Sequence, residues 1–316
     1  MVAATPGRGS LALALGLVYV IWGSGYFVIR LVIDDAPPLG SMGARFLLAG
    51  ALMALVLPAR GRSLRLAWRE LVGAAFLGIL LLACVNGMTS VGQLIGVTSG
   101  VTALLVAMVP LWICIYRTMS GSRPRNLELV GVGIGLIGLA VLVLPGSGDS
   151  DGVGTPVLGV AVVLLSSLCW SFGSWIKPRV WLPGDVLVSA TYQLLAAGAL
   201  MMSASVVVGE RLSGGISVRA WVAFGYLVVF GSIVGFTAYA WLLNHAPLPL
   251  VATHAYVNPV VAVALGTTFL AEPITFGVVL GGTLVLISVA LVVGAQRQQP
   301  GGAPNESSTE ESEALD

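Results

Sequence analysis

A histidine and an amide lie four residues apart at the start of an apolar stretch. His254 precedes "AYVNPVVA", residues 255–262, which contains Asn258. On a helix this spacing places both side chains on one face. His254 can donate to a substrate, carry a proton near neutral pH, or serve as a hydrogen-bonded packing residue. Asn258 can contact a substrate or bond across to a neighbouring helix, so both residues are candidates for a substrate site.

Arg45 is the one fixed charge that lies well inside an apolar stretch. A charge buried in a membrane is expensive and is by default a sign of function. Arg45 is therefore a candidate to attract a substrate carboxylate. The alternatives are an arginine that snorkels to the membrane surface, or one that pairs with Asp34 or Asp35 on the same side of the membrane.

Aromatic and amide side chains inside the apolar stretches complete the set of candidate substrate-binding residues. An amide in hydrocarbon needs a hydrogen-bonding partner, which favours Asn86 and Gln193. Trp and Tyr can line a pocket, but they also gather at membrane interfaces, so each aromatic candidate has two interpretations. These candidates are Trp22, Tyr26, Trp170, Tyr192 and Tyr239.

Patterns of catalysis and metal binding are missing from the sequence. It contains no HExxH motif, no carboxylate pair inside an apolar stretch and no nucleophile beside a general base. The three cysteines, Cys84, Cys114 and Cys169, fall in apolar stretches and are expected to be small apolar residues. Glu272, directly before Pro273, is expected to stabilise the start of a helix over 274–294. We predict no enzymatic activity, no metal and no cofactor.

The composition is that of a membrane protein. Of 316 residues, 57% are hydrophobic and 9% are charged, against roughly 25% charged residues in soluble domains. The net charge of +1 gives no electrostatic basis for binding nucleic acid. Because a spanning helix needs about 20 apolar residues, the sequence predicts ten of them. They cover residues 11–33, 38–58, 70–90, 97–119, 127–145, 155–177, 184–209, 219–244, 250–271 and 274–294.

The positive charges predict an orientation in the plasma membrane. If the loops alternate sides, eleven of the fifteen Lys and Arg residues fall on the side that holds both termini, and three fall on the other. The positive-inside rule then places both termini in the cytoplasm. Residues 1–10 are a cytoplasmic N-terminus, and the apolar run after them is too long for a signal peptide. The acidic tail over 295–316 has little to bury and is expected to be disordered.

The sequence also repeats itself. At a shift of 148 residues "AGALM" at 49–53 meets "AGALM" at 197–201, and the same shift places Trp22 on Trp170 and Arg45 on Gln193. Two repeats follow, 11–145 and 155–294, with a loop over 146–154. Each holds five helices, an odd number, so the repeats cross the membrane in opposite directions. Inverted repeats are typical of secondary transporters, whose substrate site lies between the halves.

Two prolines interrupt the predicted helices at equivalent places. Pro110 and Pro259 lie near the centres of their helices and are expected to kink them, freeing the carbonyls of Val106 and Ala255. Such groups need protein or a wet cavity around them, so these helices either border a central cavity or use the kinks only for packing. GxxxG spacing elsewhere predicts close helix contacts, within the monomer or in a homodimer. These glycine pairs are Gly131/Gly135, Gly231/Gly235 and Gly277/Gly281.

Several motifs resemble the EamA-type exporters of the drug/metabolite transporter superfamily. They are "YVIWGSGYFVIR" at 19–30, "RFLLAG" at 45–50, "SGVTALLVAMVPLW" at 99–112, and "AYVNPVVAVALG" with "AEPIT" at 255–275. The resemblance implies ten helices in two repeats and export of amino acids, other metabolites or toxic compounds. Because that family keeps the Arg of "RF" across varied substrates, it favours a structural or gating role for Arg45.

Together these features predict an all-α polytopic protein with the lipid bilayer and a small-molecule substrate as its partners. We expect a secondary transporter that exports small metabolites or amino acids by alternating access. A passive solute channel or a non-transporting membrane scaffold is the alternative. The sequence identifies neither the substrate nor a coupling ion.

Overall fold

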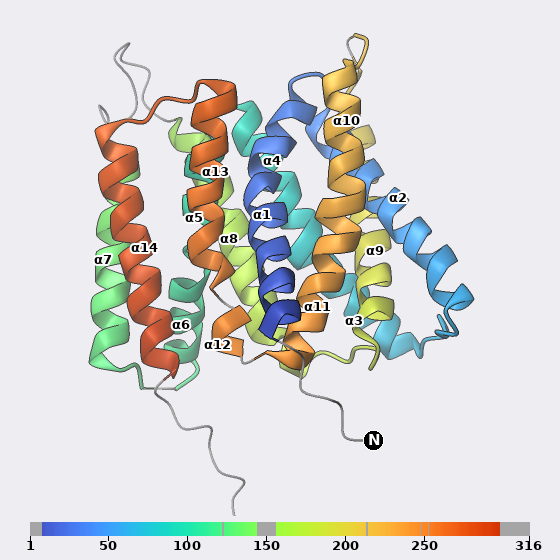
Figure 1. The fold of residues 1–316 in the computed structure, drawn as a ribbon, viewed down its shortest axis with the longest axis horizontal. Coiled ribbons are helices and arrows are strands. Elements are labelled where there is room, and N and C mark those ends of the chain that lie inside the picture. The colour runs from blue at the N-terminus through green and yellow to red at the C-terminus, as the bar shows by residue number, and fades with distance from the viewer. Residues whose placement is uncertain are drawn as a thin grey trace, which may run out of the picture.

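The computed structural model describes residues 8–121, 123–143, 156–212, 214–246, 248–251 and 253–297. Within these residues every regular element is a helix (Figure 1). The predicted loop over 146–154 and residues 298–316 of the predicted tail lie outside the described residues. Residues 295–297, which were expected to begin the tail, belong to the last helix instead.

The helices follow one another along the chain with short connections. In order they are α1 (Arg8–Ile33), α2 (Pro38–Ala59), α3 (Trp68–Gly78), η1 (Ile79–Cys84), α4 (Val85–Leu94), α5 (Ser99–Val106), α6 (Val109–Met119), α7 (Asn126–Val143), α8 (Val157–Ile176), η2 (Lys177–Arg179), α9 (Val186–Val207), α10 (Val218–Tyr226), η3 (Leu227–Val234), α11 (Gly235–His245), α12 (Leu248–Val251), α13 (His254–Leu270) and α14 (Phe276–Arg297).

The ten predicted spans are confirmed as helical segments. Within the described residues, nine segments are long and apolar enough to cross a membrane, and His254–Leu270 is a shorter apolar helix of 17 residues. Segments such as Trp68–Leu94 and Val218–Tyr239 each combine several consecutive elements. The predicted ends lie within four residues of the observed ones.

The segments run alternately up and down, so Arg8 of α1 and Arg297 of α14 lie at the same end of the bundle, the lower end in Figure 1. The connections α2–α3, α6–α7 and α8–α9 also lie at this lower end. The connections α1–α2, α9–α10 and α13–α14 lie at the upper end. This alternation gives the two five-segment halves opposite directions.

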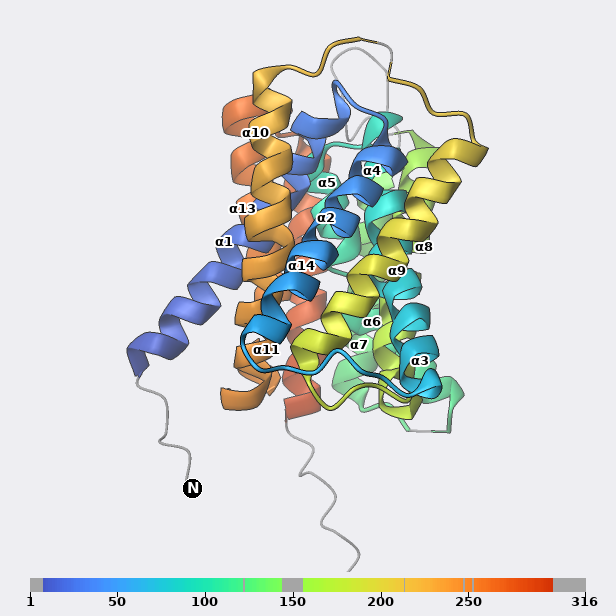
Figure 2. The ribbon, with the colours of Figure 1, turned by 90° about the vertical axis from the view of Figure 1, so that its right-hand side faces the viewer.

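Helix pairs between the halves occur in matched sets. In Figure 1, α7 of the first half packs along α14 of the second, and in Figure 2, α2 lies beside α9. Each of these pairs joins equivalent segments. The contact of α1 with η3 and α11 has its counterpart in the contact of α8 with η1 and α4. Matched packing of this kind is what an inverted repeat produces.

Two π-helical stretches reinforce the repeat. The first, η1, begins at Ile79, and the second, η3, begins at Leu227, 148 residues later. This is the shift at which Trp22 meets Trp170. π-Helical turns are rare and often occur at functional sites, because the wider turn rearranges the backbone hydrogen bonds. Both halves therefore carry a widened turn in the middle of their third segment.

The two prolines do not act as simple central kinks. The segment predicted over 97–119 is broken: α5 ends at Val106, α6 starts at Val109, and Pro110 occupies the first turn of α6, where a missing N–H costs nothing. The segment predicted over 250–271 is divided into α12 and α13, so Pro259 lies in the second turn of α13 and not at the centre of a continuous helix. Discontinuous helices replace the predicted kinks.

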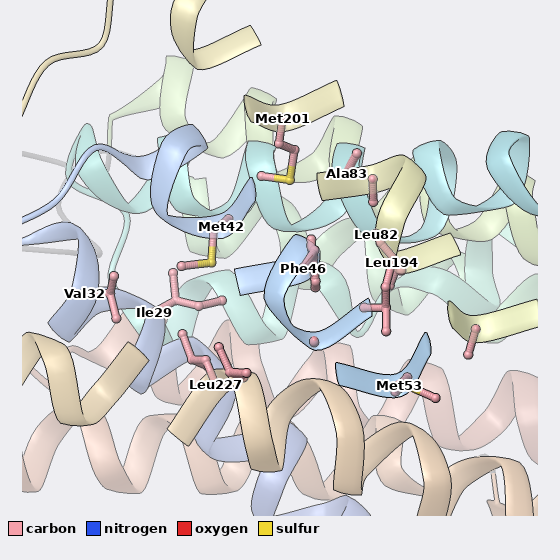
Figure 3. Close-up of a cluster of buried hydrophobic side chains, with 14 of the residues drawn as sticks. Ile29, Val32, Met42, Phe46, Met53, Leu82, Ala83, Leu194, Met201 and Leu227 are labelled. Atoms are coloured by element: carbon pink, nitrogen blue, oxygen red, sulfur yellow. The ribbon is translucent and has the colours of Figure 1, made fainter. Parts of the chain in front are cut away.

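Small residues allow the helices to approach closely. Lipid tails are as apolar as the side chains, so packing and not hydrophobic transfer holds such helices together. A Cβ on Gly43 would lie 2.8 Å from the Met202 nitrogen of α9, and one on Gly138 would lie 2.9 Å from the Gly281 carbonyl of α14. Around Gly43 the core includes Met42, Phe46, Leu194 and Leu227 (Figure 3).

Candidate functional site

Arg45 lies on α2 with 6% of its surface exposed, and no acidic residue in the described part of the chain forms an ion pair with it. Its Nε donates to the Ser232 hydroxyl at 3.0 Å, and its Nη1 donates to Asn86 Oδ1 at 3.3 Å. The alternative of a pair with Asp34 or Asp35 does not hold, because Asp34 pairs with Arg30 and Arg219 while Asp35 accepts from Ser217. Burial also excludes snorkelling.

The π-helical stretches orient both partners of Arg45. The Ser232 hydroxyl donates to the carbonyl of Leu227, five residues earlier in η3, at 3.1 Å. Asn86 donates through Nδ2 to the carbonyl of Leu82 in η1 at 3.0 Å, which turns its Oδ1 toward the guanidinium. The two widened turns therefore supply the carbonyls that hold these acceptors in place.

A second group combines aromatic rings and a histidine from α1, α11 and α13. The Trp22 ring centroid lies 4.9 Å from that of Tyr239 and 5.4 Å from that of His254, and the last two are 5.9 Å apart. Phe236 adds an edge contact to Trp22 at 5.7 Å. His254 Nδ1 is 2.9 Å from the Val251 carbonyl, so the hydrogen-bonded packing role has a partner.

Gly231 and Gly235 connect the two groups along the eighth segment. A Cβ on Gly231 would lie 3.0 Å from Arg45 Nη2, and one on Gly235 would lie 2.6 Å from Trp22 Nε1. Residues four apart share a helix face, so the guanidinium and the indole lie about one turn apart against the same face. Gly231 and Gly235 thus leave room for the side chains of Arg45 and Trp22. Gly131 and Gly135, in contrast, make the predicted close helix contact, with α14 of the same chain.

Of the predicted site residues, Trp22, Arg45, Asn86, Tyr239 and His254 thus belong to one connected set. The structure places five others apart from these contacts, and Gln193 is one of them. The Tyr26 carbonyl accepts from Gln93, and the Tyr192 hydroxyl donates to the carbonyl of Leu64. Trp170 is half-buried on α8. Asn258 is 8% exposed, its backbone lies close to Gly23, and its Oδ1 is buried without a hydrogen bond.

Gln193 shows how the second half differs from the first. Equivalent to Arg45, it lies on α9 and donates to Ser189 Oγ of its own helix at 3.0 Å. The residue equivalent to Ser232 is Cys84, which is a free cysteine. The guanidinium and its hydroxyl acceptor therefore have no counterpart in the second half, so the candidate site is asymmetric.

Ser232, Gly231 and Phe236 were missed as site residues by sequence reasoning. "GSIVG" at 231–235 was interpreted as a helix-packing motif, because glycines at that spacing usually bring helices together. The serine between them was the available signal. A hydroxyl inside an apolar stretch needs a partner, and Arg45 was the only mid-span charge that could provide one.

Carboxylates at the upper end bind helix N-termini of the opposite half. Glu272 accepts from the Ser99 and Gly100 backbone at the start of α5, so the prediction that it stabilises the start of the last helix is wrong. Glu210 accepts from the Leu39 and Gly40 backbone at the start of α2. Each acid neutralises backbone N–H groups that have no partner within their helix.

Asp35 completes this set at the start of α10. It accepts from the backbone and the hydroxyl of Ser217, the N-cap residue. These hydrogen bonds, with a smaller contribution from Arg219, hold the pKa of Asp35 below its ordinary value. Asp35 comes from the first half and α10 from the second, so the upper end is closed by contacts between the halves.

The bundle of inverted helical repeats with a buried polar group between them defines a membrane transporter. Comparison with known proteins specifies the family. Residues 10–144 and 157–294 each match the EamA-like transporter family, so the chain belongs to this family and contains two EamA domains.

Individual relatives agree with this assignment. The chain is 42% identical over 254 residues to an uncharacterized inner membrane transporter, YedA, of Escherichia coli, covering 80% of this chain and 81% of that protein. It is 24% identical over 296 residues to a probable amino-acid metabolite efflux pump of Escherichia coli, covering 90% and 94%. A solved crystal structure at 20% identity superposes with a TM-score of 0.62 over 93% of this chain and all of the other, which shows the shared fold.

Proposed function

We propose that this transporter exports small carboxylate-bearing metabolites, amino acids among them, from the cytoplasm by alternating access of its two halves. Membership of the EamA-like family and the distant relative named as a probable amino-acid metabolite efflux pump support this class of solute. The excess of Lys and Arg in the lower-end loops supports a cytoplasmic location for both termini.

The observation that carries the proposal is the charge on Arg45. Its partners in the described part of the chain are the neutral Ser232 and Asn86, Met42 Sδ at 3.7 Å, and the ring of Phe46, whose centroid lies 4.9 Å from the guanidinium carbon. A buried charge costs several kcal/mol unless it is compensated. A substrate carboxylate at the guanidinium would offset that cost, and release of the substrate would restore it. The same interaction would hold the carboxylate in a defined orientation.

The aromatic group would hold the remainder of the substrate. Since a carbonyl can only accept, the contact with Val251 makes Nδ1 of His254 the donor and leaves Nε2 of the neutral ring as an acceptor. Trp22 and Tyr239 surround that ring with apolar faces that suit a cation or an aliphatic chain. An amino acid could then place its carboxylate at Arg45 and its ammonium toward the aromatic group.

A counterflow assay tests the proposal. Purified protein in liposomes, loaded in turn with unlabelled amino acids, other carboxylates and neutral solutes, should accumulate labelled carboxylate solute transiently and saturably. A passive channel would give flux without saturation or counterflow, and a scaffold would give none. Either of those results would overturn the proposed function.

A further inference from the structure

A groove opens on the surface at the lower end, between α3 and the residues that follow η2. Its volume is about 420 Å³. A Cβ on Gly73 would lie 2.0 Å from the Trp181 carbonyl oxygen. This glycine therefore lets the backbone at Val180 and Trp181 lie directly against α3. The lining residues are Trp68, Arg69, Val72, Gly73, Phe76, Val180 and Trp181.

The walls of the groove are apolar, although they lie at the surface. Trp68 is 76% exposed and Trp181 is 68% exposed, and Val72 and Phe76 continue the apolar surface along α3. Exposed tryptophans at the end of a spanning helix lie at the level of the lipid headgroups. Along α3 the groove therefore extends from the headgroup level toward the acyl chains.

The groove is lined by one arginine, Arg69, and further arginines precede it along the chain. The connection from α2 to α3 and the start of α3 carry Arg60, Arg62, Arg65 and Arg69. Only Arg62 among them forms an ion pair within the described residues, with Asp185 at 2.5 Å. Arg69 lies in the groove itself. The groove combines apolar walls with a cation at the headgroup level.

The equivalent place in the other half lacks these features. The shift of 148 residues that relates η1 to η3 places Ser217 on Arg69 and Trp221 on Gly73. Ser217 is the N-cap residue of α10, so no guanidinium takes the place of Arg69, and the glycine that admits the neighbouring backbone is replaced by a tryptophan. The fold alone thus does not produce the groove or the available cation.

We propose that this groove binds an anionic phospholipid of the lower-end leaflet. The phosphate contacts the guanidinium of Arg69, and an acyl chain lies along Val72 and Phe76. Charge complementarity favours this occupant, since a basic site at the membrane surface attracts lipids of net negative charge over zwitterionic ones. Trp68 and Trp181 lie on either side at the headgroup level and contact the glycerol region.

Native mass spectrometry of the delipidated full chain, titrated with phosphatidylglycerol or with phosphatidylcholine in neutral detergent, tests the site. We expect one phosphatidylglycerol to be retained at least several-fold more strongly than phosphatidylcholine. Arg69→Gln should remove that preference, and Arg69→Lys should keep most of it. Arg219→Gln, which removes an arginine near the start of α10 at the other end of the bundle, should leave it unchanged. The melting temperature of each variant in detergent shows whether it is folded.

Equal retention of the two lipids by the unaltered protein would overturn the proposal. So would a preference that persists in folded Arg69→Gln. Quenching of tryptophan fluorescence by brominated phosphatidylglycerol gives a second readout, which should weaken in a Trp68→Phe, Trp181→Phe double variant. Neither measurement involves transport, so the lipid site and the proposed export function are tested separately.

Discussion

Glu210 and Arg62 occupy equivalent positions, 148 residues apart, and each stabilises the start of the second helix of the opposite half. Glu210 accepts directly from the Leu39 and Gly40 backbone at the start of α2. Arg62 acts through Asp185, whose side chain accepts from the equivalent residues of α9, Leu187 and Val188. One contact lies at the upper end and the other at the lower end, so opposite ends of the bundle carry matched contacts between the halves.

Because alternating access must separate the halves at one end while they stay closed at the other, weakening one contact should favour opening at that end. In Glu210→Gln the charge that faces the N-terminus of α2 is lost, which is worth about 0.3 to 1 kcal/mol. We expect about a two- to five-fold rise in labelling of Leu39→Cys by a membrane-impermeant maleimide, in a background without native cysteines.

Arg62→Gln is the matched control for that experiment. It should increase labelling of Leu187→Cys at the lower end and leave labelling of Leu39→Cys unchanged or reduced. If both variants increased labelling at both ends, they would be loosening the fold and not shifting a two-state equilibrium, and the gating account would fail.

Gly235 tests whether the position of the Trp22 ring matters for transport. Gly235→Ala would place a Cβ 2.6 Å from Trp22 Nε1, so the indole must move away from Tyr239 and His254. We expect transport to fall at least about ten-fold while the protein still inserts and folds. Gly225→Ala, where nothing lies within 4 Å of the new Cβ, is the control and should transport normally. Equal transport by the two variants would show that the aromatic group is not part of the substrate site.

The lowered pKa of Asp35 predicts that opening at the upper end depends on pH. Its pKa is lowered by the hydrogen bonds from Ser217, so the contact is complete above the ordinary carboxyl pKa of about 3.9 and is lost as the pH falls through the lowered value. Upper-end labelling of Leu39→Cys, corrected for the slower reaction of a reference thiol at the same pH, should therefore rise as the external pH is lowered below about 4. In Asp35→Asn, labelling at pH 7 should already be higher and the pH dependence smaller. An identical pH profile in Asp35→Asn would contradict this role.

Helix positions followed from the sequence because a spanning segment is defined by length and apolar content, which are local properties. The repeat followed from direct matches within the sequence, and the burial of Arg45 followed from its place inside an apolar stretch. The sequence did not predict which polar groups pair with each other when they lie far apart along the chain. Glu272 looked like part of the adjacent helix start, yet it binds the start of α5, 172 to 173 residues away.

The π-helical stretches and helix breaks were also beyond the sequence pattern. Apolar composition is the same in α-helical and π-helical turns, so nothing marked Ile79–Cys84 as widened. At Pro110 the sequence indicated a disturbed helix but not whether it would bend or break. Among the candidates, Trp22, Arg45, Asn86, Tyr239 and His254 proved to be connected, since their elements meet at η3 and α11.

The central claim is that Arg45 binds a substrate carboxylate within the transport path. Its most direct test measures counterflow in proteoliposomes by the unaltered protein, Arg45→Lys and Arg45→Gln. Two solutes are compared, an accepted amino acid and its amide, in which a neutral carboxamide group replaces the carboxylate. Losing one partner of a buried charged pair costs about 2 kcal/mol or more, so Arg45→Gln should lose about 30-fold or more of its carboxylate transport, with Arg45→Lys between. Carboxamide transport should change little. An equal loss for both solutes in folded Arg45→Gln would contradict the claim.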